Sequence, residues 1–282
     1  MVRILGATMA NKYSLNQIKY RLFASLYGSA NGQKRLEKKI KKLQRYLGIG
    51  SGGNVKNSGE AKIIEVVKKE KSSNLCIFDV GANKGNFAKM ALSVLRREDG
   101  LTIHCFEPSK YTYNLLKQNL AGKTQVILNN IGLGKEQGEF NLYYDEPGSG
   151  IASLTKRNLD YMGLKFNHCE RVSIDTVIHY CEEKNIDFID LLKIDVEGHE
   201  LDVLDGAVNM FRKKSIGKVS FEFGGCNIDT RTFFKDFFCY FQKYHYRLYR
   251  ITPFGYFFPI DSYKETYEQF RTTNFLAILR DN

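Results

Sequence analysis

The chain has 282 residues, of which 43% are hydrophobic and 26% are charged. These values are ordinary for a folded globular protein and exclude a disordered or collagen-like one. No apolar run approaches the roughly 20 residues of a membrane-spanning helix, and the first residues lack the basic-then-apolar layout of a signal peptide. The six cysteines show neither a C-x-x-C pair nor a metal-ligand spacing, so we expect reduced thiols in a cytoplasmic protein.

The net charge of +11 is concentrated near the N-terminus. Residues 1–75 contain 16 Lys/Arg and 4 Asp/Glu, whereas residues 76–282 contain 26 and 27. Helices are predicted at Ser14–Leu26 and at Lys34–Leu47, and the second has an apolar stripe opposite a strongly basic face. That stripe consists of Leu36, Ile40, Leu43 and Leu47.

The composition predicts a division of the chain near residue 70. Gly48–Gly59 has the composition of a flexible linker, and a further helix is expected at Glu60–Lys71. We therefore expect a basic helical extension over residues 1–70 and an α/β domain over residues 71–282.

Beyond that extension, predicted strands alternate with predicted helices. The strands are Leu75–Val80, Thr102–Phe106, Gln125–Asn129, Leu191–Ile194, Lys218–Phe223, His245–Ile251, Tyr256–Ile260 and Phe275–Leu279. The helices are Asn86–Leu95, Tyr111–Leu120, Ile174–Glu183, Glu200–Phe211 and Arg231–Tyr244. This alternation predicts a doubly wound, mostly parallel sheet. Because the last strands follow one another without a long helix, at least one should run antiparallel at the sheet edge. Asn141–Asp145 is interpreted as an inserted hairpin or flap.

The turn after the first strand has the features of a nucleoside site. Gly81 and Gly85 follow the acidic Asp79 in a strand-to-helix turn, where a ligand can approach the backbone. Asn83 lies in the same turn. Glu107 ends the second strand, where its carboxylate could accept hydrogen bonds from both hydroxyls of a ribose.

The glycine spacing favours one cofactor class over another. Dinucleotide enzymes use G-x-G-x-x-G beside a pyrophosphate, whereas this chain has Asp-x-Gly-x-x-x-Gly beginning at Asp79. A carboxylate at this position suits a cation, and the sulfonium and amino groups of S-adenosylmethionine are cationic. The pattern therefore indicates S-adenosylmethionine as cofactor.

At this point the sequence resembles the FkbM family of S-adenosylmethionine-dependent methyltransferases. The resemblance rests on Ile77-Phe-Asp79-Val-Gly81-Ala-Asn83-Lys-Gly85, Phe106-Glu107-Pro108, Ile131-Gly132-Leu-Gly134, Ser153-Leu154, Ser173-Ile-Asp175-Thr-Val177 and Asp190-Leu-Leu-Lys193-Ile-Asp195-Val-Glu197-Gly198. It implies a class I methyltransferase (Rossmann-like) sheet in residues 71–282, with Asn130 and Ile131 beside the adenine ring. It also implies O-methylation, frequently of sugar hydroxyls or polyketide-like natural products, such as occurs in polysaccharide biosynthesis.

Three residues after the fourth strand are candidates for catalysis. Asp195 and Glu197 are expected to contact the methyl donor or the acceptor, and His199 is a candidate general base because its side chain titrates nearest neutrality. The alternative is that His199 merely opens the next helix. No metal is expected; Asp195 with Glu222 would be the pair to hold one, but a third ligand is not recognisable.

The sequence leaves open which acceptor and which binding partners the protein has. The main hypothesis is an enzyme acting on a sugar hydroxyl of a glycan, nucleotide-sugar or natural product. The alternative is an RNA or other nucleic-acid methyltransferase that uses the basic arm, although the chain lacks the Pro-Pro loop of many base methyltransferases, so no nucleic acid is expected. The basic helix could also contact anionic lipid peripherally, cover the core or form a homodimer.

Overall fold

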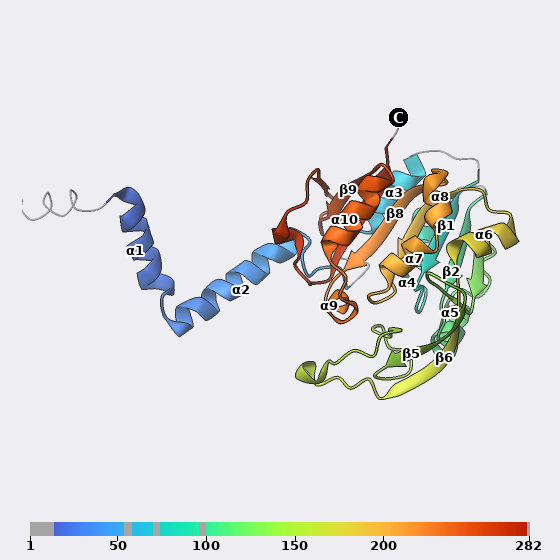
Figure 1. Ribbon diagram of the computed structural model, residues 1–282, viewed down its shortest axis with the longest axis horizontal. Coiled ribbons are helices and arrows are strands. Elements are labelled where there is room, and N and C mark those ends of the chain that lie inside the picture. Colours follow the sequence, from blue (N-terminus) through green and yellow to red (C-terminus); the bar gives the residue numbers. More distant parts are fainter. Residues whose placement is uncertain (1–13, 54–57, 70–73, 96–99, 281–282) are drawn as a thin grey trace, which may run out of the picture. The chain divides into compact units, whose positions relative to one another are not determined.

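The computed structural model describes residues 14–53, 58–69, 74–95 and 100–280. The chain divides into two compact units, Met1–Tyr46 and Leu47–Asn282. In the first unit, the predicted helices are present as α1 (Leu15–Tyr27) and α2 (Ala30–Tyr46) (Figure 1). Ser14 and Gln17 form a capping box at the start of α1, each side chain accepting a hydrogen bond from the other's backbone N–H.

The sequence prediction placed a boundary at residues 70–71, whereas the two compact units divide between Tyr46 and Leu47. Helix α3 (Ala61–Lys69) belongs to the second unit because Ile63, Ile64 and Val67 are buried in its core. Ile49, in the expected linker, is also buried. Residues 54–57 of that linker and the predicted helix end at residues 70–71 lie outside the described residues.

An eight-stranded sheet organises the second unit, in the order β10-β9-β11-β8-β7-β1-β2-β3. Its strands are β1 (Cys76–Val80), β2 (Thr102–Phe106), β3 (Val126–Asn129), β7 (Ile189–Ile194), β8 (Ile216–Phe223), β9 (Tyr246–Ile251), β10 (Phe257–Ile260) and β11 (Thr273–Leu279). The five strands from β3 to β8 are parallel, and β11 is antiparallel to both β8 and β9. The predicted doubly wound sheet with an antiparallel edge region is confirmed.

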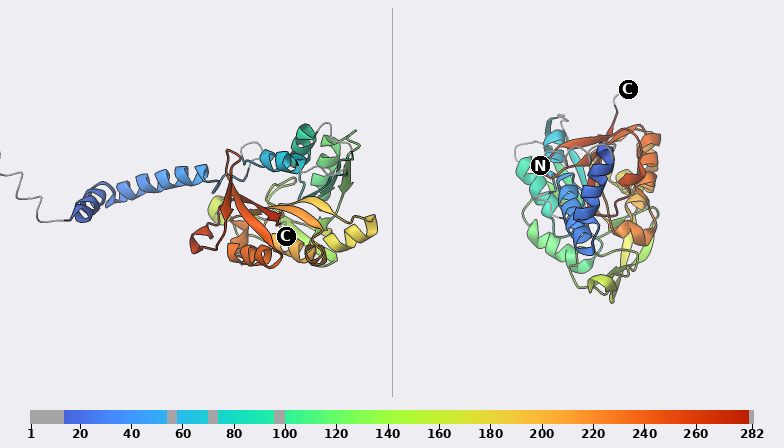
Figure 2. Two further views of the ribbon diagram at one scale, coloured as in Figure 1. Left: turned by 90° about the horizontal axis from the view of Figure 1, so that it is seen from above. Right: turned by 90° about the vertical axis from the view of Figure 1, so that its left-hand side faces the viewer.

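Helices cover both faces of the sheet (Figures 1 and 2). One face packs against α3, α4 (Asn86–Val94) and α5 (Lys110–Asn119). The other packs against α6 (Val177–Lys184), α7 (Glu200–Asp205), α8 (Val208–Arg212) and α10 (Phe234–Lys243), mainly through phenylalanines. Short helices occur at α9 (Cys226–Thr230), Asp160–Met162 and Glu265–Tyr267.

Three predicted helices of the second unit differ from those observed, and the one expected at Arg231–Tyr244 begins at Phe234. The helix expected at Glu200–Phe211 is split at Gly206, where a Cβ atom would lie 2.0 Å from the carbonyl oxygen of Gly134. This close approach favours glycine, and glycine weakens a helix interior. The helix expected from Ile174 begins at Val177, because Ile174 and Asp175 end a strand.

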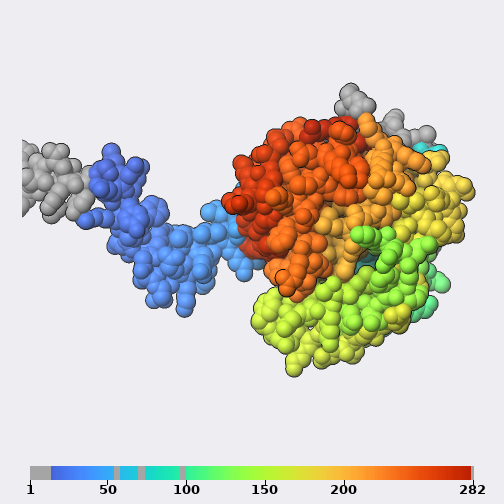
Figure 3. Space-filling model, in the orientation of Figure 1, coloured from blue at the N-terminus to red at the C-terminus, as the bar shows by residue number. Residues whose placement is uncertain are grey.

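That strand belongs to a second, three-stranded sheet. It contains β4 (Gly132–Leu133), β5 (Gly138–Tyr144) and β6 (His168–Asp175), in the order β4-β6-β5. Strand β5 corresponds to the expected flap, whereas its antiparallel partner β6 was not predicted. The segment 145–167 joins the two and forms one flank of the second unit, seen in yellow-green beside the orange α9 region in Figure 3.

Candidate functional site

The order in which the chain adds strands to the sheet reverses at β1, which lies between β2 and β7. In parallel α/β sheets, ligands bind at the carboxyl ends of the strands beside such a switch point. Gly81 follows β1 with φ of 76°, and a Cβ atom there would lie 1.8 Å from the carbonyl oxygen of Asp195. The backbones that follow β1 and β7 are therefore in direct contact, and this contact requires glycine.

Two cavities adjoin at this point. A narrow one has a volume of about 70 Å³, and a wide one has a volume of about 620 Å³. Both are lined by Gly81, Asn83, Gly150, Asp195 and Glu197. These shared residues make the two cavities neighbouring compartments of one site.

The narrow cavity combines one carboxylate with an apolar wall. Glu107 is 7% exposed, and its two oxygens accept hydrogen bonds from the backbone N–H groups of Asn83 and Ser109, each at 3.0 Å. Burial raises the pKa of Glu107 to about 7, against the opposing effect of these two hydrogen bonds. The apolar wall consists of Pro108, Leu133, Leu142, Leu154 and Ile174.

The chemistry of these residues suits contacts with the nucleoside of the predicted cofactor. The carboxylate oxygens of Glu107 keep lone pairs beyond the two backbone bonds, so they can accept the hydroxyls of a ribose. The apolar wall can contact a planar base, and the turn at Gly81 leaves the backbone accessible at the junction of the cavities.

The wide cavity is lined by both charged and apolar residues. The charged residues are Glu60, Arg157, Lys193, Asp195, Glu197, Glu222 and Arg271. The apolar residues include Phe87, Leu159, Tyr161, Met162, Leu164 and Phe270. Its wall therefore offers several hydrogen-bonding groups to a polar molecule together with apolar surface.

Three carboxylates meet where the cavities join. Asp195, Glu197 and Glu222 each place one oxygen within 4.8 Å of the others. Burial and the neighbouring Asp195 raise the pKa of Glu197 to about 8, and Arg157 opposes this shift. Burial and the charges of Asp195 and Glu197 raise the pKa of Glu222 well above its usual range. The sequence indicated only Asp195 and Glu222 as possible metal ligands, and the structure adds Glu197 as a third. Carboxylate oxygens of this kind could hold a divalent cation.

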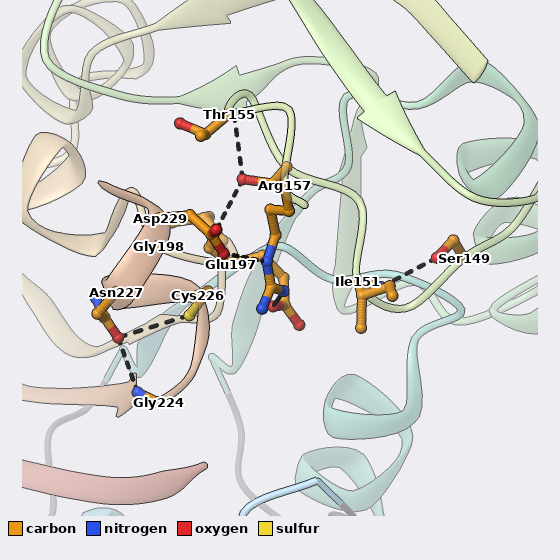
Figure 4. Close-up of polar contacts among 12 residues, drawn as sticks. Ser149, Ile151, Thr155, Arg157, Glu197, Gly198, Gly224, Cys226, Asn227 and Asp229 are labelled. Atoms are coloured by element: carbon orange, nitrogen blue, oxygen red, sulfur yellow. Dashed lines mark hydrogen bonds and ion pairs between the residues drawn. The ribbon is translucent and has the colours of Figure 1, made fainter. Parts of the chain in front are cut away.

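Arg157 is the main residue that the sequence analysis missed. Its guanidinium lies 3.1 Å from Glu197 Oε2 and 2.9 Å from Asp229 Oδ2, and its side chain is 8% exposed. Figure 4 shows it extending from the segment before β6 toward both carboxylates. The hydroxyl of Ser153 in the same segment donates to the backbone oxygen of Glu197 at 2.8 Å. No sequence spacing signals these contacts, because 40 and 72 residues separate Arg157 from its partners.

Asp79 lies beneath the junction and lines neither cavity. It is fully buried, and its Oδ1 is 3.2 Å from Nζ of Lys193. Lys193 also lies 3.3 Å from Asp195 Oδ2. Burial lowers the pKa of Lys193, but the two carboxylates outweigh this effect and raise it. Asp79 can therefore act on the site through Lys193 and Asp195, while a direct cofactor contact stays a prediction.

His199 is held on both sides. Its Nδ1 lies 2.7 Å from Asp202 Oδ2, and its Nε2 lies 3.0 Å from the hydroxyl of Thr155. It lines the narrow cavity at the start of α7 and is not part of the wall of the wide cavity. Both ring nitrogens thus have protein partners.

The remaining predicted residues have structural contacts. The side-chain amide of Asn130 donates to the backbone oxygens of Glu107 and Pro108, both at 3.0 Å, and Ile131 packs against the larger core. Gly85 precedes α4 and packs against Leu116 of α5. None of these three lines either cavity, although Gly132 and Leu133, which follow Ile131, line the narrow one.

Comparison with known proteins now identifies the family. The Methyltransferase FkbM domain matches residues 79–248. Methyltransferase sdnD of Sordaria araneosa is 30% identical over 160 residues, covering 48% of this chain and 61% of that protein. The 2-O-methyltransferase NoeI of Sinorhizobium fredii is 24% identical over 147 residues, covering 49% and 59%. The chain thus spans about three fifths of these relatives.

Among solved structures, a methyltransferase FkbM from Methylobacillus flagellatus aligns with a TM-score of 0.43 and 14% identity, covering 73% of this chain and 44% of that one. The family match covers more than half of the chain and includes the turn after β1, the end of β2 and the acids after β7. The resemblance found in the sequence is confirmed: the chain belongs to the FkbM family of methyltransferases, whose methyl donor is S-adenosylmethionine.

Proposed function

We propose that the protein is an S-adenosylmethionine-dependent O-methyltransferase that acts on a sugar hydroxyl of a glycan, nucleotide-sugar or glycosylated natural product. The observation that carries this proposal is the junction of the two cavities. A site with a carboxylate and an apolar wall adjoins a wide cavity with charged walls, and Asp195 and Glu197, which line both, place oxygens within 4.8 Å of Glu222. A methyl donor and a hydroxyl acceptor can therefore meet beside a proton acceptor.

The narrow cavity would hold the adenosyl part of the cofactor. Glu107 would accept hydrogen bonds from the ribose hydroxyls, and Asn83 holds Glu107 in place through its backbone N–H. Asp195, at the junction, would face the cationic methionine part. Bound S-adenosylmethionine would supply an electrophilic methyl group on its sulfonium.

Glu197 is the general base in this proposal. It lines both cavities, so its carboxylate lies where the acceptor hydroxyl would meet the methyl group. A base works best when its pKa is near the operating pH, and the pKa of Glu197 is raised to about 8. His199 suits this role less well because Asp202 and Thr155 occupy its ring nitrogens. We assign His199 to positioning the loop after β7.

A sugar suits the wide cavity for two reasons. Sugar hydroxyls both donate and accept hydrogen bonds, and the wall presents carboxylates beside the guanidinium of Arg157. The apolar residues of the wall can contact the C–H face of a sugar ring. The relative NoeI, named a 2-O-methyltransferase, supports transfer to oxygen.

The reaction is proposed to proceed without a metal ion. Arg157 places a permanent positive charge 3.1 Å from Glu197 Oε2 and so competes with a cation for that ligand. Methyl transfer that is unchanged after incubation with EDTA would support this assignment, whereas loss of transfer that added Mg²⁺ restores would replace it with a metal-assisted mechanism.

The test is transfer of a labelled methyl group to a panel of acceptors. We expect S-adenosylhomocysteine to bind with micromolar affinity in calorimetry, and label to appear in a neutral glycan or nucleotide-sugar. Total RNA serves as the competing acceptor. Label in RNA instead of sugar would overturn the proposal in favour of a nucleic-acid methyltransferase.

A further inference from the structure

The N-terminal unit carries two apolar stripes that none of its described residues, 14–46, covers. No residue of α1 is buried, and its stripe is 48–76% exposed. This stripe consists of Leu15, Ile18, Leu22 and Leu26, which follow helical spacing. Phe23, beside the stripe, is 59% exposed. Such a face needs an apolar partner.

Helix α2 combines a second stripe with a strong positive charge. Ile40 is 45% exposed and Leu43 is 61% exposed, and only Gly32 is buried in the whole helix. The helix contains seven Lys/Arg residues and a single acid, Glu37. Most of the basic residues lie on the opposite face, because Lys34, Lys38, Lys41 and Arg45 are about half a turn around the helix from the apolar stripe.

A hollow at the junction of the two helices gathers three of these cations. It has a volume of about 350 Å³ and is lined by Leu26, Tyr27, Arg35, Lys38 and Lys39. Nζ of Lys39 donates to the hydroxyl of Tyr27 at 3.1 Å. A concave site with three cations above an apolar floor matches a phosphate group attached to a hydrocarbon chain.

We propose that the α1–α2 unit, residues 14–46, binds the surface of a bilayer that contains anionic phospholipid. The apolar stripes would enter the boundary between headgroups and acyl chains, while the lysines and arginines contact phosphates. Binding is peripheral, because no helix among the described residues is long and apolar enough to cross a membrane. The inference does not depend on which acceptor the enzyme methylates.

Charge favours a lipid surface over a second copy of the chain. Pairing of two α2 stripes would bring seven cations on each helix together, with one acid on each to compensate them. Nucleic acid would match the charge but would leave the four apolar residues of α1 exposed. An anionic bilayer satisfies both the charge and the apolar stripes.

The experiment is sedimentation of the full chain with vesicles of phosphatidylcholine, alone or with about 30% phosphatidylglycerol. We expect at least about tenfold tighter binding to the anionic vesicles, decreasing as salt is added. Equal binding to both vesicles, or binding to neither, would overturn the proposal.

Matched variants test the stripe itself. Leu22→Glu should weaken vesicle binding about tenfold, because it places a charge on the apolar face. Ala24→Glu adds the same charge to the opposite face of α1 and should change binding by no more than about twofold. Equal effects of the two variants would reject an apolar contact.

Further measurements distinguish a lipid surface from a second copy of the chain and from nucleic acid. Circular dichroism and S-adenosylhomocysteine binding should be the same in both variants, which shows that the second unit is folded. A change from dimer to monomer in Leu22→Glu would assign the stripe to a second copy, and RNA binding in place of vesicle binding would assign the unit to nucleic acid. Either result would overturn the lipid proposal.

Discussion

The two adjoining cavities are built in different ways. The narrow one is lined by the ends of β1 and β2, by β4, β5 and β6, by residues 149–154 and by the loop after β7, and its carboxylate, Glu107, is held by backbone N–H groups. The wide one takes its charged residues from the turn before α3, the segment before β6, β7 and the loop after it, β8 and the turn before β11, and three of its acids lie close together. Backbone N–H groups therefore hold the carboxylate of the narrow cavity, whereas side chains from distant segments surround the acids of the wide one.

This difference indicates that cofactor binding and proton transfer depend on different parts of the site. In the narrow cavity, two hydrogen bonds stabilise the charged form of Glu107 against burial. In the wide cavity, like charges add to burial, so that both Glu197 and Glu222 have raised pKa values. A carboxylate whose pKa lies near the operating pH, as that of Glu197 does, is suited to proton transfer. The comparison predicts that variants in the two cavities will affect different measured constants.

The largest effect is expected for Glu197→Gln. Loss of the general base should lower kcat by about 100-fold or more, while the Kd of S-adenosylhomocysteine should stay within about threefold, since the amide keeps the shape of the side chain. Labelled methyl transfer and calorimetry give the two values. His199→Asn is the matched control and should lower kcat by less than about tenfold; a larger loss than that of Glu197→Gln would restore His199 as the base.

Glu107→Ala should show the opposite pattern. Removing a carboxylate that accepts two ribose hydroxyls should weaken S-adenosylhomocysteine binding by about 10- to 100-fold. At saturating cofactor, kcat should fall by no more than about threefold. A variant that binds the cofactor normally but turns over slowly would show that the narrow cavity does not hold the ribose.

Much of the fold follows from sequence pattern. Buried parallel strands such as β1 and β7 contain short apolar runs, and this local signal places them within a residue or two. Strand β6 was missed because five of its eight residues are polar or charged, and it pairs with β5 rather than with the main sheet. The split between α7 and α8 depends on the contact of Gly206 with Gly134, which a helical pattern does not reveal.

The residues of the site likewise include some that sequence pattern predicts and some that it does not. Gly81 and Glu107 follow strands that are adjacent in the sheet, so their positions at the narrow cavity could be predicted from the order of strands. Asp79 is the next-to-last residue of β1, but its buried side chain contacts Lys193 and lines neither cavity, and side-chain direction near a strand end is not given by spacing alone. Arg157 reaches Glu197 through the fold of a long irregular segment, which carries no periodic signal.

Arg157→Met tests whether that segment adjusts the acids of the wide cavity. The guanidinium favours the charged form of Glu197, so its loss should raise the pKa of Glu197 further. Because the base must be deprotonated, the acidic limb of the kcat profile should move to higher pH, and activity near pH 7 should fall about tenfold. Arg157→Lys should restore part of it. A uniform loss at every pH would mean that Arg157 only holds the segment in place.

The smallest effect concerns the protonation of Glu107. Its pKa is raised to about 7, so the side chain gains a proton as the pH falls from 8 to 6 and loses capacity to accept a hydroxyl. Binding of S-adenosylhomocysteine should weaken about three- to fivefold over this range. Glu107→Gln cannot titrate, so its weaker binding should be nearly independent of pH. S-adenosylhomocysteine lacks the sulfonium charge, so the protonation of Glu197 should have little influence on its binding. An equal pH dependence in both proteins would show that the titrating group belongs to the wide cavity, and the division of the site into a binding half and a chemical half would then be wrong.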